Sequence, residues 1–517
     1  MTNIVNTKSG KVQGYTENGL QIFKGIPFAA PPIGPLRFSP PAPRDPWSDV
    51  LDAKKFGPYA LQGTNPLAMM LNWDISNQSE AECLTLNIWT PATDDKKRPV
   101  MVWIHGGGFT IGGSADPLYD GSALARRGNI VVVSINYRLG ALGYLYIPGV
   151  TANAGQLDQI AALEWVRDNI ESFGGDSNNV TIFGESAGGV AVATLIAMPT
   201  AKGLFHRVIA QSGACHPMLY GASMAKRISE KLMTKLKIEP GDIDALRKVP
   251  VKKIIRGQNK IGGMIGDFSR RVQSSSEEMD IMAFSPIIDG DTLPKHPLEA
   301  VRAGYASDVK LIVGTNQDEM KLFAAMNPAW RNLDSEGLDK FIQLGSGFLG
   351  QDKNKGKQLI EIYKEAREEG RLSTTPYDLL SAIFTDSFFT IGAIRLAEAY
   401  YTHQPNIYVY LFTWPSPAFD GQFGACHGLE IPFVFGMLHS PGMEVLLKGL
   451  GPAEDSLSER MLDAWIAFAR SGNPNHAGLP KWPSYNVEKR PTMLFDSEIK
   501  VVDAPFRKEL AAWDGIF

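Results

Sequence analysis

One serine in this chain stands in a sequence that suits nucleophilic chemistry. Gly-Glu-Ser-Ala-Gly at 184–188 follows the apolar run Val180–Phe183, and it is the only Gly-x-Ser-x-Gly sequence in the chain. Glycines two residues before and after Ser186 allow a strand to turn sharply into a helix that begins near Ala187. Such a turn sets the hydroxyl beside the free N–H groups of a helix N-terminus. Ser186 is therefore predicted to be a nucleophile, the alternative being an ordinary glycine-rich turn.

A second glycine-rich segment suits the stabilisation of negative charge. His-Gly-Gly-Gly-Phe at 105–109 follows the strand-like run Val100–Ile104. Consecutive glycines leave backbone amides uncovered, and such amides can converge on the oxygen that becomes negative when a serine attacks a carbonyl. We expect Gly107, Gly108 and the amide of Ala187 to form an oxyanion hole. A flexible loop is the alternative.

A serine hydroxyl needs a base and a carboxylate that orients the base. Among eight histidines, His427 lies in a glycine-flanked loop after the apolar run Ile407–Phe412, and we expect it to be the base. The acid should lie between serine and histidine in the chain. Asp318 and Glu319 follow the buried strand predicted at 310–315, and spacing does not choose between them.

These segments resemble the type-B carboxylesterases, the family of cholinesterases, liver carboxylesterases and bacterial para-nitrobenzyl esterases. The resemblance covers nearly the whole chain. It is carried by the motifs at 23–29, 31–32, 37–38, 82–87, 136–140, 157–159, 169–170, 173–176, 184–188, 318–319 and 427–436. It implies an α/β-hydrolase fold with Ser186, Glu319 and His427 as a catalytic triad. It also implies Gly107, Gly108 and Ala187 as oxyanion donors, and it selects Glu319 over Asp318.

The chain departs from the family pattern at three places. Met320 stands where the family has glycine after the catalytic glutamate. The acidic pair before the family cysteine is here Ala81-Glu82, which leaves the partner of Arg138 open between Glu80 and Glu82. No cysteine precedes Cys83, so we expect a free, buried thiol where animal relatives form a disulfide.

Aromatic residues near these motifs are candidates for the substrate pocket. Phe109 follows the oxyanion glycines, and we expect its ring to wall the acyl side of the site. Phe323, Phe388 and Phe389 are further candidates. For each of them, ordinary core packing is the alternative.

Three more positions take their roles from the resemblance or from neighbouring residues. Trp73 has the offset from Cys83 at which cholinesterases place a choline-binding tryptophan, but Leu322 supplies no second aromatic face. Glu185 adjoins the nucleophile and could tune His427, or be a structural carboxylate. Ser212 matches a family serine that supports the acid–histidine pair.

Alternating strands and helices predict the architecture. Short apolar runs suit parallel strands covered on both faces. They are Val100–Ile104, Ile130–Asn136, Val180–Phe183, Arg207–Gln211, Lys310–Val313 and Ile407–Phe412. Helical patterns lie at Leu157–Glu171, Ala187–Met198, Ala222–Leu236 and Leu457–Arg470. We predict one catalytic domain, 1–517, with a doubly wound, mostly parallel sheet and an antiparallel N-terminal edge. Helical cap insertions are expected at about 214–284 and 324–390.

Composition excludes several other classes of protein. A net charge of −4 over 517 residues does not indicate the basic surface that nucleic-acid binding requires. No run of about 18 apolar residues predicts a membrane span. Three widely separated cysteines form no metal-site spacing and suggest a reducing compartment. With no visible signal peptide, we expect a cytoplasmic protein, which is predicted to be a monomer.

The sequence therefore predicts a serine carboxylic-ester hydrolase that acts on a small-molecule ester and needs no metal or cofactor. Activity should rise with pH near an ordinary histidine pKa of about 6–7. We expect short- to medium-chain esters of bulky or aromatic alcohols to be preferred, and choline esters to be poor substrates. An amide or carbamate hydrolase, or a non-catalytic binding protein on the same fold, are the alternatives.

Overall fold

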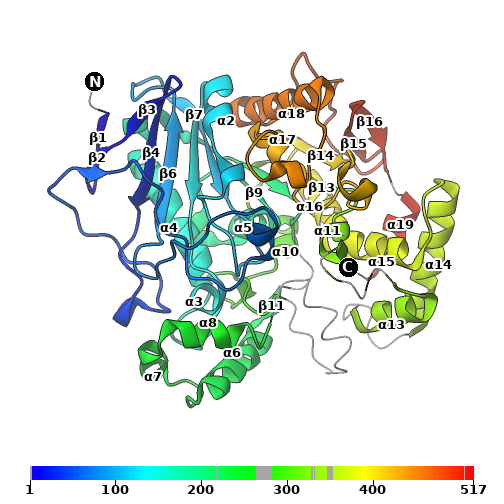
Figure 1. The fold of residues 1–517 in the computed structure, drawn as a ribbon, viewed down its shortest axis with the longest axis horizontal. Coiled ribbons are helices and arrows are strands. Elements are labelled where there is room, and N and C mark those ends of the chain that lie inside the picture. The colour runs from blue at the N-terminus through cyan, green and yellow to red at the C-terminus, as the bar shows by residue number, and fades with distance from the viewer. Residues whose placement is uncertain are drawn as a thin grey trace.

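The computed structural model describes residues 3–215, 219–262, 282–325, 327, 330, 332–345, 353–505 and 507–516. Parts of both expected caps lie outside these ranges, at 216–218 and 263–281 in the first and at 326, 328–329, 331 and 346–352 in the second. Figure 1 shows the arrangement of the chain around its central sheet.

An eleven-stranded sheet organises the molecule. Its spatial order is β16 (Lys500–Asp503), β15 (Pro491–Phe495), β14 (Ile407–Phe412), β13 (Lys310–Asn316), β10 (Arg207–Gln211), β9 (Gly175–Glu185), β7 (Arg98–Ile104), β8 (Val131–Ile135), β6 (Thr85–Thr90), β4 (Leu20–Pro27) and β3 (Tyr15–Glu17). The strands from β15 to β8 pair in parallel. Strands β6, β4 and β3 at one edge and β16 at the other pair antiparallel. The mostly parallel sheet with an antiparallel N-terminal edge is thus confirmed.

Strand β7 shows why the predicted strands are apolar throughout. Successive side chains of a strand point to opposite faces. Val100, Val102 and Ile104 enter one hydrophobic core, whereas Met101 and Trp103 enter another. Both faces are therefore buried, as parallel strands require.

Helices supply the other half of each core. The first core contains residues of α4 (Ala154–Asn169), α5 (Ala187–Ala197), α10 (Pro297–Arg302) and α16 (Ile391–Tyr401). The second contains residues of α2 (Ser122–Gly128), α17 (Ile431–Phe435) and α18 (Pro452–Ser471). The sheet is thus doubly wound, as predicted.

The N-terminal residues add a small sheet of their own. Strands β1 (Ile4–Thr7) and β2 (Gly10–Gln13) form an antiparallel pair, and β5 (Leu51–Asp52) joins β2 in parallel. This three-stranded sheet lies beside the N-terminal edge of the large one (Figure 1).

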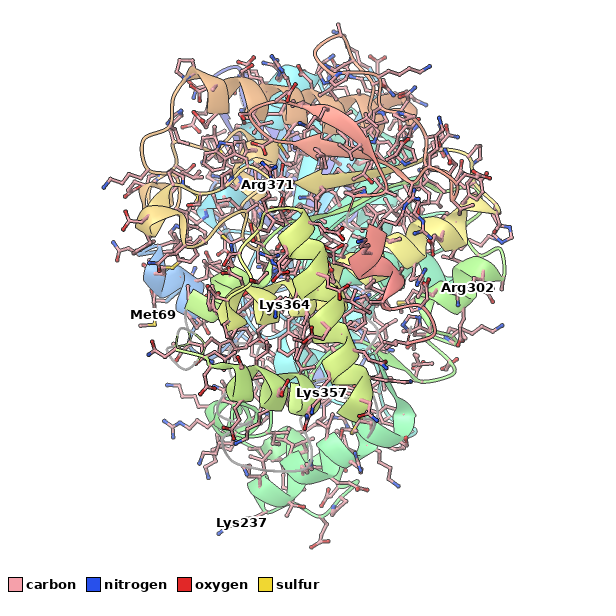
Figure 2. All side chains as sticks on the ribbon, turned by 90° about the vertical axis from the view of Figure 1, so that its right-hand side faces the viewer. Met69, Lys237, Arg302, Lys357, Lys364 and Arg371 are labelled. Atoms are coloured by element: carbon pink, nitrogen blue, oxygen red, sulfur yellow. The ribbon has the colours of Figure 1, made fainter. Side chains whose placement is uncertain are left out.

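Two helical segments interrupt the strand–helix alternation. The first contains α6 (Ala222–Leu236), α7 (Ile243–Lys248) and α8 (Val251–Gln258). The second contains α11 (Met320–Ala325), α13 (Ser335–Gly345), α14 (Lys353–Glu369) and α15 (Pro376–Thr385), and α19 (Arg507–Ala511) packs with it around a third core. Helix α14 runs along the outside with Lys357 and Lys364 directed to solvent (Figure 2), while Leu359 and Tyr363 are buried beneath it.

Helix α15 continues through a π-helical turn, η6 (Asp386–Thr390), into α16. The combined helix, Pro376–Tyr401, is the one helix in the described ranges long and apolar enough to cross a bilayer. It is largely buried inside the protein, as an interior helix would be.

Two expectations about buried polar groups have different outcomes. Cys83 is a free, buried thiol, as predicted. The expected partners of Arg138 were wrong: Asp158 forms the ion pair with it, at 2.7 Å, and both side chains are buried. Glu80 instead pairs with Arg37, so it is not free to reach Arg138.

Candidate active site

Ser186 occupies a strained turn between β9 and α5. Its φ of 56° and ψ of −122° lie where side-chain-bearing residues are uncommon. The neighbouring glycines make this turn possible. A Cβ at Gly188 would stand 2.0 Å from the Ile104 carbonyl oxygen, and one at Gly213 would stand 2.0 Å from that of Ser186. The turn presents the Ser186 side chain to a pocket at the carboxyl ends of the parallel strands.

The glycine loop after β7 runs beside this serine. A Cβ at Gly106 would lie 3.1 Å from the Cβ of Ser186. Gly107 and Gly108 have φ of 104° and 59°, in the left-handed region that glycine tolerates. Among the described residues, neither of their amides donates a hydrogen bond. Ala187 is the first residue of α5, so its N–H also lacks a partner within the helix.

His427 lies in the turn before α17 and contacts a buried carboxylate. Its Nδ1 donates to Glu319 Oε2 at 2.6 Å, and Glu319 Oε1 accepts the Asn316 N–H at 2.7 Å. Asp318 lies apart from the imidazole: it pairs with Lys321 at 2.9 Å and accepts a backbone N–H of the loop before His427. The structure therefore brings together His427 and Glu319, the acid that the resemblance selected.

A buried network behind the carboxylate was not foreseen from the sequence. Asn316 Nδ2 donates to Glu430 Oε2 and to the Cys426 carbonyl, both at 2.7 Å. Gln211 donates to the other oxygen of Glu430 at 3.1 Å and accepts from Trp465 at 3.0 Å. The network ties the strand that leads to Glu319 to the loop that carries His427. In the sequence, the polar residue at the end of the strand, Asn316, and the glutamate at 430 could have indicated this network.

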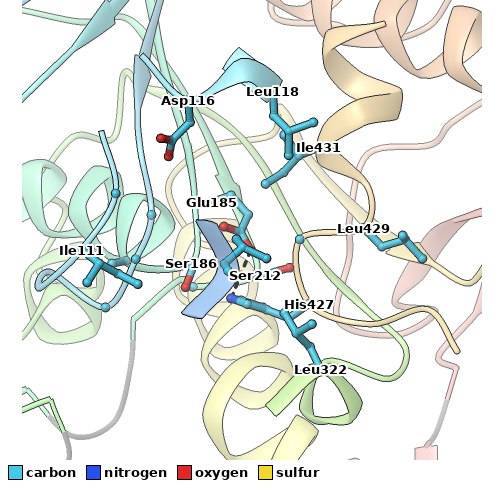
Figure 3. A pocket seen from close by; sticks show the side chains of 18 of the residues that line it. Ile111, Asp116, Leu118, Glu185, Ser186, Ser212, Leu322, His427, Leu429 and Ile431 are labelled. Carbon is cyan, nitrogen blue, oxygen red and sulfur yellow. Dashed lines mark ion pairs between the residues drawn. The ribbon is translucent and has the colours of Figure 1, made fainter. Parts of the chain in front are cut away.

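Glu185 contacts the other nitrogen of the imidazole. Its Oε1 lies 3.2 Å from His427 Nε2, the atom that must exchange a proton with the serine (Figure 3). Burial alone would lower the pKa of His427, but the charges of Glu185 and Glu319 outweigh it and raise the pKa to about 9. Burial also raises the pKa of Glu185, to about 8, although the charge of His427 opposes this. The two carboxylates that contact the ring favour a histidine pKa above the expected range of about 6–7, and the sequence does not show these contacts.

Ser212 follows β10 and lines the same pocket. Its N–H donates to the Gly314 carbonyl at 2.8 Å. Its hydroxyl is buried, and in the described part of the chain it has no hydrogen-bond partner. The oxyanion loop, Ser186, Ser212, Glu319 and His427 thus follow the consecutive sheet strands β7, β9, β10, β13 and β14.

Aromatic side chains close one side of the pocket. The rings of Phe323 and Phe389 lie 5.1 and 4.8 Å from the imidazole of His427. Phe388, Leu322 and Trp73 also line the pocket. Phe388 and Phe389 are carried by the π-helical turn η6, a distortion that often occurs at functional positions.

Phe109 does not wall the site. Its ring packs edge-on against Tyr144, at 5.0 Å between centroids, and is fully buried in the first core. The residue has a φ of 58°, and it is absent from the pocket lining. The expectation was wrong because sequence adjacency to the glycine loop does not fix the direction of a side chain at a turn.

The pocket has an empty volume of about 1290 Å³, which includes its opening to solvent. Apolar side chains predominate in its walls, among them Leu118, Ile431 and Leu446. Met282 comes from the first helical segment and Phe388 from the second. Figure 3 shows Ser186, Glu185, Ser212 and His427 together within it.

This fold, with a serine at a strand–helix turn and a histidine–carboxylate pair at the carboxyl ends of parallel strands, defines the class of α/β-hydrolases. The chain belongs to the carboxylesterase family, whose model, described as "Carboxylesterase family", matches residues 1–513. It is 39% identical over 511 residues to a para-nitrobenzyl esterase of Bacillus subtilis (strain 168), covering 97% of this chain and 96% of that protein. It is 34% identical to a phenmedipham hydrolase of Pseudarthrobacter oxydans, covering 96% and 95%.

Solved structures agree with these relatives. A Geobacillus stearothermophilus carboxylesterase superimposes with a TM-score of 0.84 at 36% identity, covering 99% of this chain and all of that one. A structure titled as a thermophilic PNB esterase superimposes with a TM-score of 0.85 at 35% identity over the whole of both chains. The protein is therefore a carboxylesterase that acts on small-molecule esters, and the resemblance stated from its motifs is confirmed.

Proposed function

We propose that Ser186, His427 and Glu319 hydrolyse carboxylic esters through an acyl-enzyme. The observation that carries this proposal is the 2.6 Å contact between His427 and the buried Glu319, in the pocket that Ser186 enters on its strained turn. Ser186 Oγ attacks the ester carbonyl carbon while its proton passes to His427 Nε2. The amides of Gly107, Gly108 and Ala187 donate hydrogen bonds to the oxyanion of the tetrahedral intermediate.

The intermediate then collapses, and the bond to the alcohol breaks. The imidazolium gives its proton to the leaving oxygen, and Glu319 stabilises that imidazolium while it exists. Water attacks the acyl-enzyme with His427 as base, which releases the acid and restores the serine. The contact of Glu185 with Nε2 supports a role in setting the proton affinity of His427 in this cycle.

Substrate preference is part of the proposal. Phe323 and Phe389 lie close to the imidazole, and Phe388 lines the same pocket. These three rings favour acyl groups of short to medium length with bulky or aromatic alcohols. Each added methylene should contribute at most about 0.8 kcal/mol until the pocket is full. The two helical segments contribute Met282 and Phe388 to its walls, which supports their role as a cap on a single catalytic domain.

A cytoplasmic monomer completes the proposal. All three cysteines are buried and unpaired, as suits a reducing compartment. In the described ranges the exposed large apolar side chains are spread over separate segments of the chain, which suits a monomer. A net charge of −4 does not indicate a basic surface for nucleic acid.

Substitution and a substrate panel test the proposal. Ser186→Ala and His427→Ala should each lower turnover by about 10⁴-fold, with the exposed Ser497→Ala as the control. More than a few per cent of activity in Ser186→Ala would overturn the nucleophile. Across para-nitrophenyl esters from acetyl to palmitoyl, with a choline ester and an anilide alongside, kcat/KM should peak at short to medium chains. A palmitoyl maximum, or efficient cleavage of the choline ester or anilide, would contradict the substrate assignment.

A further inference from the structure

Asp116 is a carboxyl group in the pocket wall for which the hydrolytic steps have no use. It precedes the short helix η2 (Pro117–Tyr119) and lines the same pocket as Ser186 and His427 (Figure 3). Only 6% of the residue is exposed. Among the described residues its Oδ1 has no hydrogen-bond partner. A buried carboxyl oxygen without a donor is costly, and an N–H of a bound molecule that reached this oxygen would relieve that cost.

Within the described part of the chain, no positively charged group contributes to the pKa of Asp116. The hydroxyl of Tyr59, an uncharged donor, forms a hydrogen bond with the Asp116 carboxyl group. Burial raises the pKa of Asp116 to about 7, although the bond to Tyr59 opposes this. The described residues that line the pocket include no lysine or arginine. His427 is the one basic side chain in this lining, and it already pairs with Glu185 and Glu319.

An uncharged phenol, that of Tyr119, lines the same pocket. Tyr119 lies three residues after Asp116, and burial raises its pKa well above the usual value. The charges of Asp116 and Glu185 both add to that rise, so the phenol lies within the field of both carboxyls. Leu118 and Ile431 lie next to each other and add apolar surface to this pocket (Figure 3). This part of the pocket therefore favours a group that is positive at one end and apolar at the other.

We propose that Asp116 forms a subsite that binds a protonated amine bearing at least one N–H on the substrate, and that it disfavours anionic substrates. An ammonium N–H both donates to the orphan Oδ1 and supplies the missing positive charge. A quaternary ammonium supplies the charge without the donor, and a carboxylate meets only like charge. The inference rests on the proposed function, because it assigns a substrate class to the pocket of Ser186.

Binding to a catalytically inactive protein tests the subsite without turnover. Dimethylhexylammonium is titrated calorimetrically into Ser186→Ala, and into the same protein carrying Asp116→Asn or Asp116→Leu. Each Asp116 substitution should weaken binding at least about tenfold, the loss that removal of a hydrogen bond to a charged group commonly brings. The exposed Asp49→Asn is the matched control and should leave the affinity as it was. Trimethylhexylammonium, which lacks the N–H, should bind more weakly to Ser186→Ala than the dimethyl compound.

The outcomes separate Asp116 from its neighbour. Equal affinity in the proteins with and without the Asp116 substitutions would overturn the subsite, as would a loss caused only by Glu185→Gln.

A kinetic comparison extends the test to substrates. Dimethylaminoalkyl butyrates with linkers of increasing length are paired with the isosteric isopropyl-terminated alkyl butyrates. At the best linker length, the ratio of kcat/KM within a pair should favour the amine in the unmodified enzyme and fall about tenfold in Asp116→Leu. An unchanged ratio would contradict the subsite. Failure of the proposed function would be seen in a different measurement: the Ser186→Ala protein would still hydrolyse esters, whatever its affinity for amines.

Discussion

Replacing Glu185 with glutamine removes a negative charge 3.2 Å from His427 Nε2 and changes the shape of the side chain little. Burial alone would hold the pKa of His427 below its ordinary 6.5, and the charge of Glu185 is the largest single effect that opposes burial and raises the pKa to about 9. Loss of that charge should lower the pKa by at least about one pH unit, which corresponds to about 1.4 kcal/mol.

The sign of the effect on activity follows from the role of the histidine as a base. Attack by the serine requires neutral His427, so activity falls as the pH falls through the pKa of His427. A lower pKa extends activity to lower pH. The acid limb of kcat/KM should therefore lie well above pH 6.5 in the unmodified enzyme and move downward in Glu185→Gln.

Rates of butyrate ester hydrolysis by pH-stat titration, from about pH 5 to about pH 10, measure this limb directly. The exposed Glu82→Gln removes the same charge outside the pocket and should leave the limb in place. An acid limb that coincides in Glu185→Gln and the unmodified enzyme, or that moves upward, would refute the reasoning. It would mean that Glu185 holds a proton while His427 titrates, as its own raised pKa of about 8 allows.

Four other substitutions probe the site and its supports. Glu319→Gln should lower kcat by a factor on the order of 10⁴, because it removes the charge that stabilises the imidazolium, whereas Asp318→Asn should act more mildly through the loop; steady-state kinetics of the pair would contradict this if the losses were equal. Gly188→Ala places a Cβ 2.0 Å from a backbone oxygen of β7, so esterase activity should be lost, and full activity would show that the turn is not needed in this form. Asp158→Ala leaves the Arg138 charge buried without its partner and should lower the free energy of unfolding by about 3–5 kcal/mol in urea denaturation; a change below about 1 kcal/mol would contradict a buried pair.

Local sequence patterns predicted the backbone of this protein well. Apolar runs such as Val100–Ile104 and Ile407–Phe412 became parallel strands because both faces of the sheet are covered, and the glycines around Ser186 became the turn that they permit. The resemblance to carboxylesterases then placed Glu319 where the structure has it, against His427.

Side-chain partners from distant segments were harder to foresee. Arg138 pairs with Asp158 of α4 and not with Glu80 or Glu82, the acidic residues of the motif before Cys83. Phe109 has a positive φ, and its side chain packs in the core against Tyr144. The local sequence does not predict this backbone angle. The raised pKa of His427 and the orphan oxygen of Asp116 depend on how several strand ends converge, which no local pattern contains.

Labelling of the nucleophile tests the central claim most directly. Diethyl para-nitrophenyl phosphate releases para-nitrophenolate when an activated serine attacks its phosphorus, and the enzyme keeps the diethylphosphoryl group. Intact-mass and peptide mass spectrometry should find one such group per chain, on the peptide that contains Ser186, and activity should fall in proportion to labelling. Ser186→Ala should remain unlabelled. Inactivation with the label on another residue, or full labelling with activity retained, would contradict the assignment of Ser186 as the nucleophile of this carboxylesterase.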